Sequence, residues 1–306
     1  MLIREALAEA EAMLATGTHG ERVRPDAELL LMRVLNRDKS WLLAHRDEVL
    51  SSEAAARFQQ WIERRKTGEP VQYILGEAEF YRLPFRVAPG VLIPRPETEH
   101  LVEEVLRLLA LMPSPTPLIA DIGTGSGAIA VALAHARRNT HQDTRVTAVD
   151  ISPAALAVAR ENAARNGVAE HIRFVEGDLL APLDGERFDC IASNPPYVAR
   201  DERETLSIEV REHEPELALY GGADGLDVYR RLIPAARRHL VANGWLALEI
   251  GYGQRAAIEA MLLMAGYAEI DFVADYQGIA RVARARNPAK PEPHWIALQP
   301  DSQRRI

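Results

Sequence analysis

Short apolar runs alternate with helical patterns along residues 118–283, and this alternation constrains the fold more than any other feature. The apolar runs are Leu118–Ala120, Val146–Val149, Ile172–Val175, Phe188–Ser193, Trp245–Ile250, Ile270–Val273 and Ile279–Ala283. Helical patterns cover Ala128–Ala136, Pro153–Asn166, Val228–Leu240 and Gln254–Ala265. Strands that alternate with helices form parallel sheets covered on both faces, so we predict an α/β fold with a mostly parallel sheet.

The segments on either side of this region have other patterns. Apolar spacing is helical up to about Gly68, and then Phe80, Phe85 and Val87 alternate with polar residues around prolines and a glycine. We therefore predict a helical-bundle domain over residues 1–78, a β-hairpin linker over 79–93 and the α/β domain over 94–286. Residues 287–306 combine prolines with mixed charge and lack periodicity, so we expect a loose tail.

Composition excludes several classes of protein. The chain has 306 residues, is 47% hydrophobic and carries a formal net charge of -8 without a long basic run. It can therefore build one large core and a smaller domain, and we expect no direct contact with nucleic acid. No apolar run reaches the length of a membrane span and residues 1–10 do not resemble a secretory signal, so we expect a cytoplasmic protein that does not contact membranes.

The single cysteine and the scattered histidines argue against a metal centre. Cys190 is the only cysteine, which excludes an internal disulfide and a cysteine-rich metal site, and its place in an apolar run predicts a small buried hydrophobe. No histidine pair has metal-ligand spacing. We expect no bound metal.

A glycine-rich turn between the first apolar run and its helix predicts a nucleotide site. It reads Asp121-Ile-Gly123-Thr124-Gly125-Ser126-Gly127, and Asp150 follows the next run, where an acid would bind ribose hydroxyls. These letters alone do not separate a nicotinamide dinucleotide from S-adenosylmethionine. Asp121 would repel a pyrophosphate and attract a cationic amino-acid group, which favours S-adenosylmethionine.

Asp178 and Leu179 follow the third apolar run. Asp178 is placed to hydrogen-bond an adenine amino group while Leu179 packs on the ring. The alternative is a loop aspartate that caps local backbone.

The tetrapeptide Asn194-Pro195-Pro196-Tyr197 follows the fourth apolar run and predicts methyl transfer to a planar amino nitrogen. Such a nitrogen has a delocalised lone pair and needs two acceptors that hold its N–H bonds. Asn194 offers a side-chain carbonyl, Pro195 presents a backbone carbonyl without a competing donor, and Tyr197 offers a flat face. The alternative is a Pro-Pro turn that only ends a strand.

These motifs together resemble the bacterial protein-(glutamine-N5) methyltransferases, and more narrowly the branch that acts on peptide chain release factors. The residues that carry the resemblance are Asp121 to Gly127, Asp150, Asn194 to Tyr197, Gly76, Phe80, Pro94 to Glu99 and Ala223 to Asp227. The resemblance covers nearly the whole chain up to Asn287. It implies a Rossmann-like class I methyltransferase domain with a seven-stranded sheet.

The resemblance also implies roles for individual residues. Gly123 to Gly127 and Asp150 would hold S-adenosylmethionine, and Asn194 to Tyr197 would hold the substrate glutamine, with Asn194 contacting both ligands. Many members have an aromatic residue where this chain has Leu179, which implies an apolar adenine contact without a ring stack. The implied substrate is the glutamine of the Gly-Gly-Gln motif in class I release factors, and the N-terminal domain would recognise the body of the factor.

Three other functions stay open at this point. The same tetrapeptide would suit a nucleic-acid adenine-N6 methyltransferase, a relative could methylate a ribosomal protein glutamine, and a non-catalytic protein could bind the cofactor alone.

Arg95, Glu97 and Glu99 are candidate lid or substrate contacts. Their alternative role is the start of a capped helix, with acids at its positive end.

Overall fold

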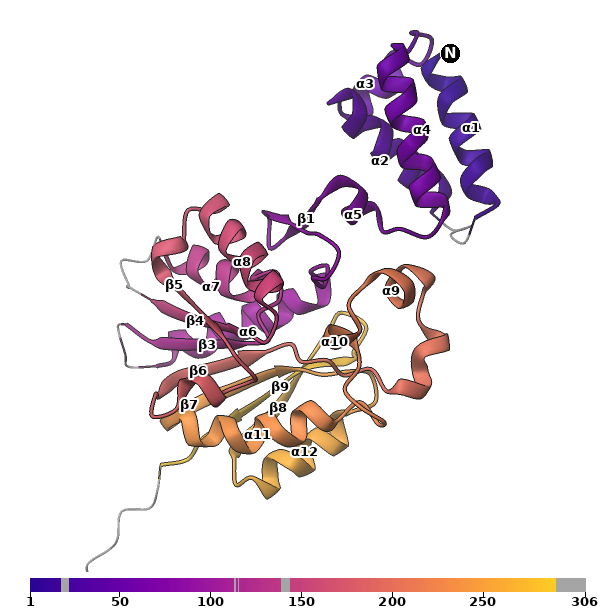
Figure 1. Ribbon diagram of the computed structural model, residues 1–306. Coiled ribbons are helices and arrows are strands. Elements are labelled where there is room, and N and C mark those ends of the chain that lie inside the picture. The colour runs from indigo at the N-terminus through magenta and orange to yellow at the C-terminus, as the bar shows by residue number, and fades with distance from the viewer. Residues whose placement is uncertain (18–21, 113, 115, 139–143, 290–306) are drawn as a thin grey trace, which may run out of the picture.

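The computed structural model describes residues 1–17, 22–112, 114, 116–138 and 144–289. Its first part is a helical bundle that lies apart from a larger α/β domain, and a short hairpin joins the two (Figure 1). Of the predicted tail over 287–306, residues 290–306 lie outside the described residues.

Four helices with a common apolar core form the bundle. They are α1 (Ile3–Ala15), α2 (Val23–Leu35), α3 (Lys39–Ala44) and α4 (Ser52–Lys66), and a short α5 (Val71–Leu75) follows. Asp38 and Ser51 accept hydrogen bonds from Trp41 N–H and Ala54 N–H, which fixes where α3 and α4 begin. The core side chains include Leu14, Leu30, Leu31, Phe58 and Ile62. This part of the chain is helical, as its apolar spacing predicts.

A two-stranded hairpin leads from the bundle to the α/β domain. Strands β1 (Glu77–Phe80) and β2 (Leu83–Arg86) pair antiparallel through a turn at Tyr81 and Arg82, both at positive φ. Phe80 and Phe85 are buried in the core of the α/β domain. The hairpin therefore belongs structurally to that domain, although its first strand begins inside the predicted 1–78 segment.

A buried arginine also connects the bundle to the α/β domain. Arg65, in the last turn of α4, is 2% exposed and hydrogen-bonds Asp26 of α2 at 2.7 Å. Its Nη2 also pairs with Glu209 in α9 (Ile208–His213), a helix of the α/β domain. Figure 1 shows α9 reaching towards the bundle.

The seven-stranded sheet has the order β5-β4-β3-β6-β7-β9-β8. All neighbours from β5 to β7 are parallel, and β9 and β8 form an antiparallel edge. The strands are β3 (Leu118–Ile122), β4 (Arg145–Asp150), β5 (Ile172–Glu176), β6 (Phe188–Ser193), β7 (Leu240–Glu249), β8 (Ala268–Ala274) and β9 (Ala280–Arg286). The order reverses between β3 and β6, and ligands of such sheets bind at the carboxyl ends beside this reversal.

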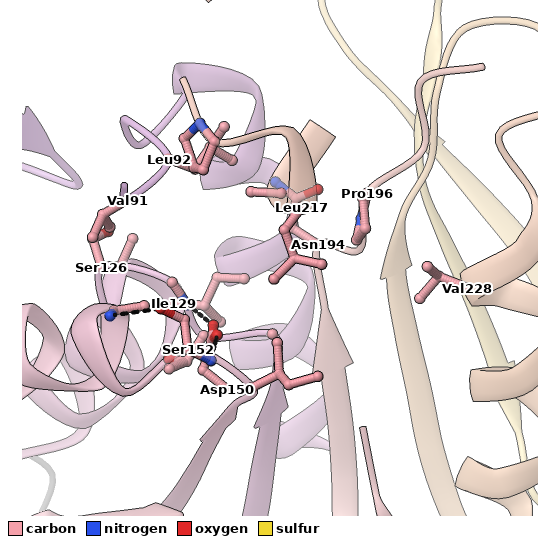
Figure 2. Close-up of a pocket in the computed structure, with 18 of the residues that line it drawn as sticks. Val91, Leu92, Ser126, Ile129, Asp150, Ser152, Asn194, Pro196, Leu217 and Val228 are labelled. Atoms are coloured by element: carbon pink, nitrogen blue, oxygen red, sulfur yellow. Dashed lines mark hydrogen bonds between the residues drawn. The ribbon is translucent and has the colours of Figure 1, made fainter. Parts of the chain in front are cut away.

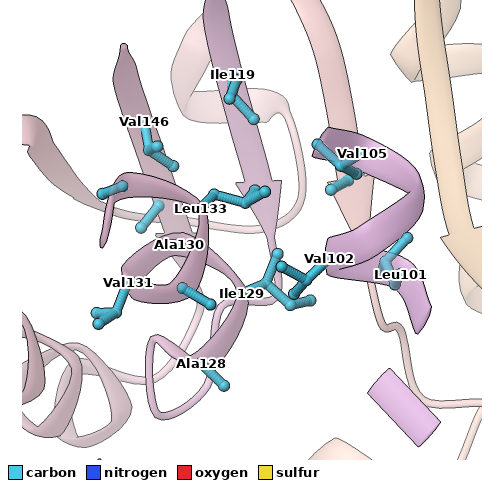
Figure 3. Packing of buried hydrophobic residues seen from close by; sticks show 14 of the residues in the cluster. Leu101, Val102, Val105, Ile119, Ala128, Ile129, Ala130, Val131, Leu133 and Val146 are labelled. Atoms are coloured by element: carbon cyan, nitrogen blue, oxygen red, sulfur yellow. The ribbon is translucent and has the colours of Figure 1, made fainter. Parts of the chain in front are cut away.

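Helices cover both faces of the sheet. Helices α6 (Glu99–Ala110), α7 (Ala128–Arg138) and α8 (Pro153–Arg165) lie on one face, and α11 (Asp227–His239) and α12 (Arg255–Met264) lie on the other. Ile119 packs with the first group and Ala120 with the second, as strand alternation requires. Figure 3 shows α7 packed between the strand residues Ile119 and Val146 and the α6 residues Val102 and Val105.

Short helices complete the domain. They are α10 (Glu216–Leu219) and the 3-10 helices η1 (Pro96–Thr98), η2 (Ala169–His171), η3 (Ala181–Leu183) and η4 (Arg200–Thr205). Cys190 is fully buried in the core, as predicted. Among the described residues, no helix is both long enough and apolar enough to cross a membrane.

Candidate active site

A cavity of about 430 Å³ lies at the carboxyl ends of β3, β4 and β6, where the strand order reverses. Figure 2 shows Asp150 and Ser152 on one side of this cavity and Asn194, Pro196 and Leu217 on another. Other lining residues are Val91, Leu92, Arg95, Thr98, Gly123, Thr124, Gly125, Ser126, Ile129, Asp178, Leu179, Tyr220, Val228 and Arg231. The two predicted motifs therefore face one space, because their strands are neighbours in the sheet.

The glycine loop leaves open space beside its backbone. Gly123 and Gly125 have φ of +74° and +55°, and a Cβ atom at either position would meet no protein atom within 4 Å. Gly127 does not line the cavity. A Cβ there would lie 3.0 Å from the Cβ of Ala159, so this glycine allows α7 and α8 to pack closely.

Asp121 lies behind the loop, fully buried, and does not line the cavity. Its Oδ2 accepts hydrogen bonds from Thr124 Oγ1 at 2.6 Å and from Ala130 N–H at 3.1 Å. Burial raises the pKa of this carboxyl from its ordinary value of 3.8 to about 7. Among the described residues, its Oδ1 has no hydrogen-bond partner. The structure shows Asp121 holding the loop and the start of α7, and the cofactor contact predicted for it stays a prediction.

Two other predicted acids do reach the cavity. Asp150 ends β4 and accepts hydrogen bonds from Gly125 N–H at 2.8 Å and Ser152 N–H at 2.9 Å. Asp178 pairs with Arg231 of α11, and both line the cavity beside Leu179. Asp178 therefore has a defined partner, which neither the adenine interpretation nor the capping interpretation includes.

Asn194 is oriented by a second side chain of the cavity. Its Nδ2 donates a hydrogen bond to Thr98 Oγ1 at 3.1 Å, and both residues line the cavity. This bond occupies the amino end of the Asn194 amide and leaves Oδ1 as the available acceptor.

The three residues after Asn194 separate in space. Pro196 lines the cavity, whereas Pro195 is buried and, like Tyr197, is not among the lining residues. The Tyr197 ring packs with the apolar cluster under α11 and α12, and its hydroxyl lies 3.4 Å from Glu249 Oε1. The flat face of Tyr197 therefore lies beside the end of the sheet and not on the cavity wall.

Glu249 ends β7 and is a buried acid next to this tetrapeptide. It is 2% exposed and hydrogen-bonds Thr98 and Tyr197. Within the described part of the chain, Glu249 Oε2 is buried without a hydrogen-bond partner. Burial raises the pKa of the Glu249 carboxyl from 4.5 to about 7, and the hydrogen bonds from Thr98 and Tyr197 oppose that shift.

The predicted lid segment splits into different roles. Arg95 lines the cavity and pairs with Glu214, which also accepts a hydrogen bond from Ile93 N–H at 3.4 Å. Burial raises the pKa of Glu214, and Arg95 opposes this. Glu97 is exposed and is not a lining residue, and Glu99 accepts a hydrogen bond from Tyr81 N–H at 2.8 Å. Arg95 is thus the one of these three residues that lines the cavity, and the lid or substrate contacts of all three stay predictions.

Comparisons with known proteins place the chain in a family. Residues 5–76 match the PrmC N-terminal domain model, and residues 105–211 match the methyltransferase small domain model. The release factor glutamine methyltransferase of Moorella thermoacetica is 47% identical over 279 residues, which cover 91% of this chain and 96% of the relative. The chain belongs to the release factor glutamine methyltransferase family.

Other relatives agree with this membership. The family member from Geobacter sulfurreducens is 43% identical over 266 residues, covering 87% of this chain and 90% of the relative. The crystal structure of the hMettl16 catalytic domain superposes with a TM-score of 0.53 at 17% identity, covering 81% of this chain and 87% of that one. That likeness concerns the fold alone. The family resemblance and the class I methyltransferase fold predicted from the sequence are confirmed.

Four residues around the cavity were not singled out from the sequence as parts of a site. They are Thr98, Glu214, Arg231 and Glu249. An acid at the end of an apolar run, as at Glu249, is the one signal that was available for them. The others come close to the motifs only through the folding of distant segments.

Proposed function

We propose that this protein transfers a methyl group from S-adenosylmethionine to the side-chain amide nitrogen of the glutamine in the Gly-Gly-Gln motif of class I peptide chain release factors. The observation that carries this proposal is the Asn194 amide, whose oxygen is left free in the same cavity as the glycine loop. Membership of the release factor glutamine methyltransferase family supports the choice of substrate.

The glycine loop and its surroundings fit the cofactor. A ligand can approach the backbone at Gly123 and Gly125, because a Cβ there would meet no protein atom within 4 Å. The carboxylate of Asp150 lines the same cavity and favours a cationic ligand with hydroxyl groups, whereas the charge of Asp178 is balanced by Arg231. When bound, S-adenosylmethionine supplies a methyl group activated by a positively charged sulfur.

The protein's part in the reaction is to hold the glutamine amide in one orientation. Asn194 Oδ1 accepts one N–H of the substrate amide, and the Pro195 backbone carbonyl is proposed as acceptor of the other. Both oxygens stabilise positive charge that develops at the nitrogen. Positioning of this kind contributes on the order of 7–11 kcal/mol to lowering a barrier when the reacting atoms are well aligned.

The segment after the tetrapeptide covers the cavity and excludes water. Pro215, Leu217 and Tyr220 line the cavity, and the pairing of Arg95 with Glu214 holds this segment against the residues before η1. A glutamine on an extended loop would enter beside Leu217, which is 65% exposed. Removal of water strengthens the hydrogen bonds made inside.

The helical bundle is proposed to recognise the body of the release factor. Its residues 5–76 match a family-specific domain, and Arg65 links it to α9, in the segment that covers the cavity. Under this proposal the protein works in the cytoplasm, where release factors act.

The test incubates the purified protein with S-adenosylmethionine labelled in the methyl group and a class I release factor. A factor with its Gly-Gly-Gln glutamine changed to alanine serves as the matched control. We expect label on the normal factor and none on the control. Label on both factors, or label only on added ribosomal protein or RNA, would contradict the proposed substrate.

A further inference from the structure

Thr98 lies between the buried Glu249 and the acceptor in the cavity, and these three residues form a relay. Thr98 lowers the pKa of the Glu249 carboxylate by hydrogen bonding, and Thr98 Oγ1 accepts from Asn194 Nδ2 at 3.1 Å. Thr98 is 4% exposed and Glu249 is 2% exposed, so water does not compete for these groups. The three residues come from η1, the loop after β6 and the end of β7.

We propose that Glu249 is a positioning residue that acts through Thr98 to decide which end of the Asn194 amide faces the substrate. This inference rests on the proposed function, because it concerns the residue that would hold the glutamine. Glu249 is not among the residues that line the cavity, so its effect on the reaction passes through Thr98.

The direction of the relay depends on the charge of Glu249. An ionised carboxylate only accepts hydrogen bonds, so the Thr98 hydroxyl must point its proton at Glu249. Thr98 Oγ1 then accepts from Asn194 Nδ2, which leaves Asn194 Oδ1 for the substrate. The hydrogen bond from Asn194 to Thr98 in the structure has this direction.

A protonated Glu249 permits the opposite arrangement. Its hydroxyl can donate to Thr98 Oγ1, which frees the Thr98 proton to point at Asn194. The Asn194 amide then gains a hydrogen bond from Thr98 by turning its oxygen towards that hydroxyl, and its N–H groups face the cavity. The N–H groups of Asn194 and of the substrate amide would then face each other without an acceptor. The substrate amide would lose Asn194 Oδ1, one of its two hydrogen-bond partners.

The charged groups around Glu249 place this change near neutral pH. Burial is the largest influence and raises the pKa of Glu249 to about 7, while Thr98 and Tyr197 lower it by hydrogen bonding. Glu97 raises this pKa and Arg281 lowers it. Tyr229 of α11 also faces the strand end, where its hydroxyl donates to the Glu249 backbone carbonyl at 2.7 Å.

The experiment measures single-turnover methylation of a class I release factor on both sides of pH 7 with the full-length protein. The variants are Glu249→Gln, which cannot ionise, Thr98→Val, which lacks the hydroxyl, and Thr98→Ser, which retains it. Tyr267→Phe is the control, because it removes a different buried hydroxyl, one that donates to Ile233 O at 3.1 Å. Binding of S-adenosylhomocysteine is measured in parallel.

We expect the wild-type rate to rise through pH 7, and Glu249→Gln to lose that rise. At the higher pH, Glu249→Gln and Thr98→Val should be slower by about 100-fold, the size of effect that a small misplacement produces. Thr98→Ser should stay within about 3-fold of wild type, and affinity for S-adenosylhomocysteine should be unchanged in all variants. A purely structural role would not distinguish serine from valine at position 98 in this way.

The outcomes separate this inference from the proposed function. If Glu249→Gln keeps the pH-dependent rise, or if Thr98→Val is as fast as Thr98→Ser, the relay is refuted while the methyltransferase activity stands. If the wild type does not methylate the release factor glutamine at all, the proposed function itself is refuted. Should Glu249→Gln not fold, the comparison of the two Thr98 variants decides the question alone.

Discussion

A methyl group added at Gly125 should block the cofactor while hardly affecting the protein around it. Gly125 has φ of +55°, and a Cβ atom there would meet no protein atom within 4 Å, so the space it would enter belongs to the cavity. An L-residue in this left-handed conformation costs roughly 1–2 kcal/mol of stability. Gly125→Ala should therefore fold and lose about that amount.

Gly125→Ala should also weaken binding of S-adenosylhomocysteine, and the strain in its backbone does not account for that loss. Forcing one methyl group into an occupied, well-packed site costs about 1–3 kcal/mol, which corresponds to roughly 5- to 150-fold weaker binding of S-adenosylhomocysteine. Gly185→Ala is the matched control, because Gly185 has φ of +80°, has equally open surroundings and is not among the residues that line the cavity.

Urea unfolding and isothermal titration calorimetry measure the two effects separately. Both variants should lose similar stability, and only Gly125→Ala should lose affinity for S-adenosylhomocysteine. Equal affinities in the two variants would refute the assignment of this loop as the cofactor cradle.

Three further perturbations test the packing and the buried charges. Gly127→Ala should lose more stability in urea than Gly125→Ala, because its Cβ would lie 3.0 Å from that of Ala159; equal losses would contradict the close approach of α7 and α8. Asp121 has its pKa raised by burial from 3.8 to about 7, so its contribution to stability is present at low pH and is lost as pH rises from 3.8 through about 7. Asp121→Asn should reduce this fall in the free energy of unfolding by up to about 4 kcal/mol, measured by unfolding at several pH values. An unchanged dependence of the unfolding free energy on pH would refute this role of Asp121. Arg65→Ala should destabilise the protein by about 3–5 kcal/mol in urea, because it removes the buried partner of Asp26 and leaves this acid only the exposed Arg22 at 3.6 Å, and a loss below about 1 kcal/mol would contradict that role.

The sheet could be predicted because its strands are short apolar runs, each bounded by polar or glycine-rich turns. All seven predicted runs overlap observed strands, and the predicted Phe188–Ser193 has the observed ends. The start of β7 at Leu240 differs from the predicted Trp245. The segment Ala242–Asn243–Gly244 interrupts the apolar pattern of that strand. It lies at an irregularity in the pairing with β6, where Leu240 pairs with Phe188 and the next partner of β6 is Trp245.

The site was predictable where its residues form a continuous motif or directly follow an apolar run, as Asp150 and Asp178 do. The glycine loop and the segment from Asn194 each form a single continuous motif, and the topology brings their two strands together. The orientation of the Asp121 side chain could not be predicted in this way. It points from the strand towards α7, where it accepts a hydrogen bond from Ala130 N–H, and this contact depends on how the helix packs on the sheet. Thr98 and Glu249 are 151 positions apart in number and meet only through the tertiary fold.

The most direct test of the central claim compares the wild type with Asn194→Ala on a class I release factor. Tandem mass spectrometry locates the methyl group, and calorimetry with S-adenosylhomocysteine checks that the cofactor site is intact. We predict that the wild type methylates the Gly-Gly-Gln glutamine and that Asn194→Ala loses at least about 100-fold in rate while cofactor binding stays largely intact. Methylation of that glutamine by Asn194→Ala at the wild-type rate would contradict the account.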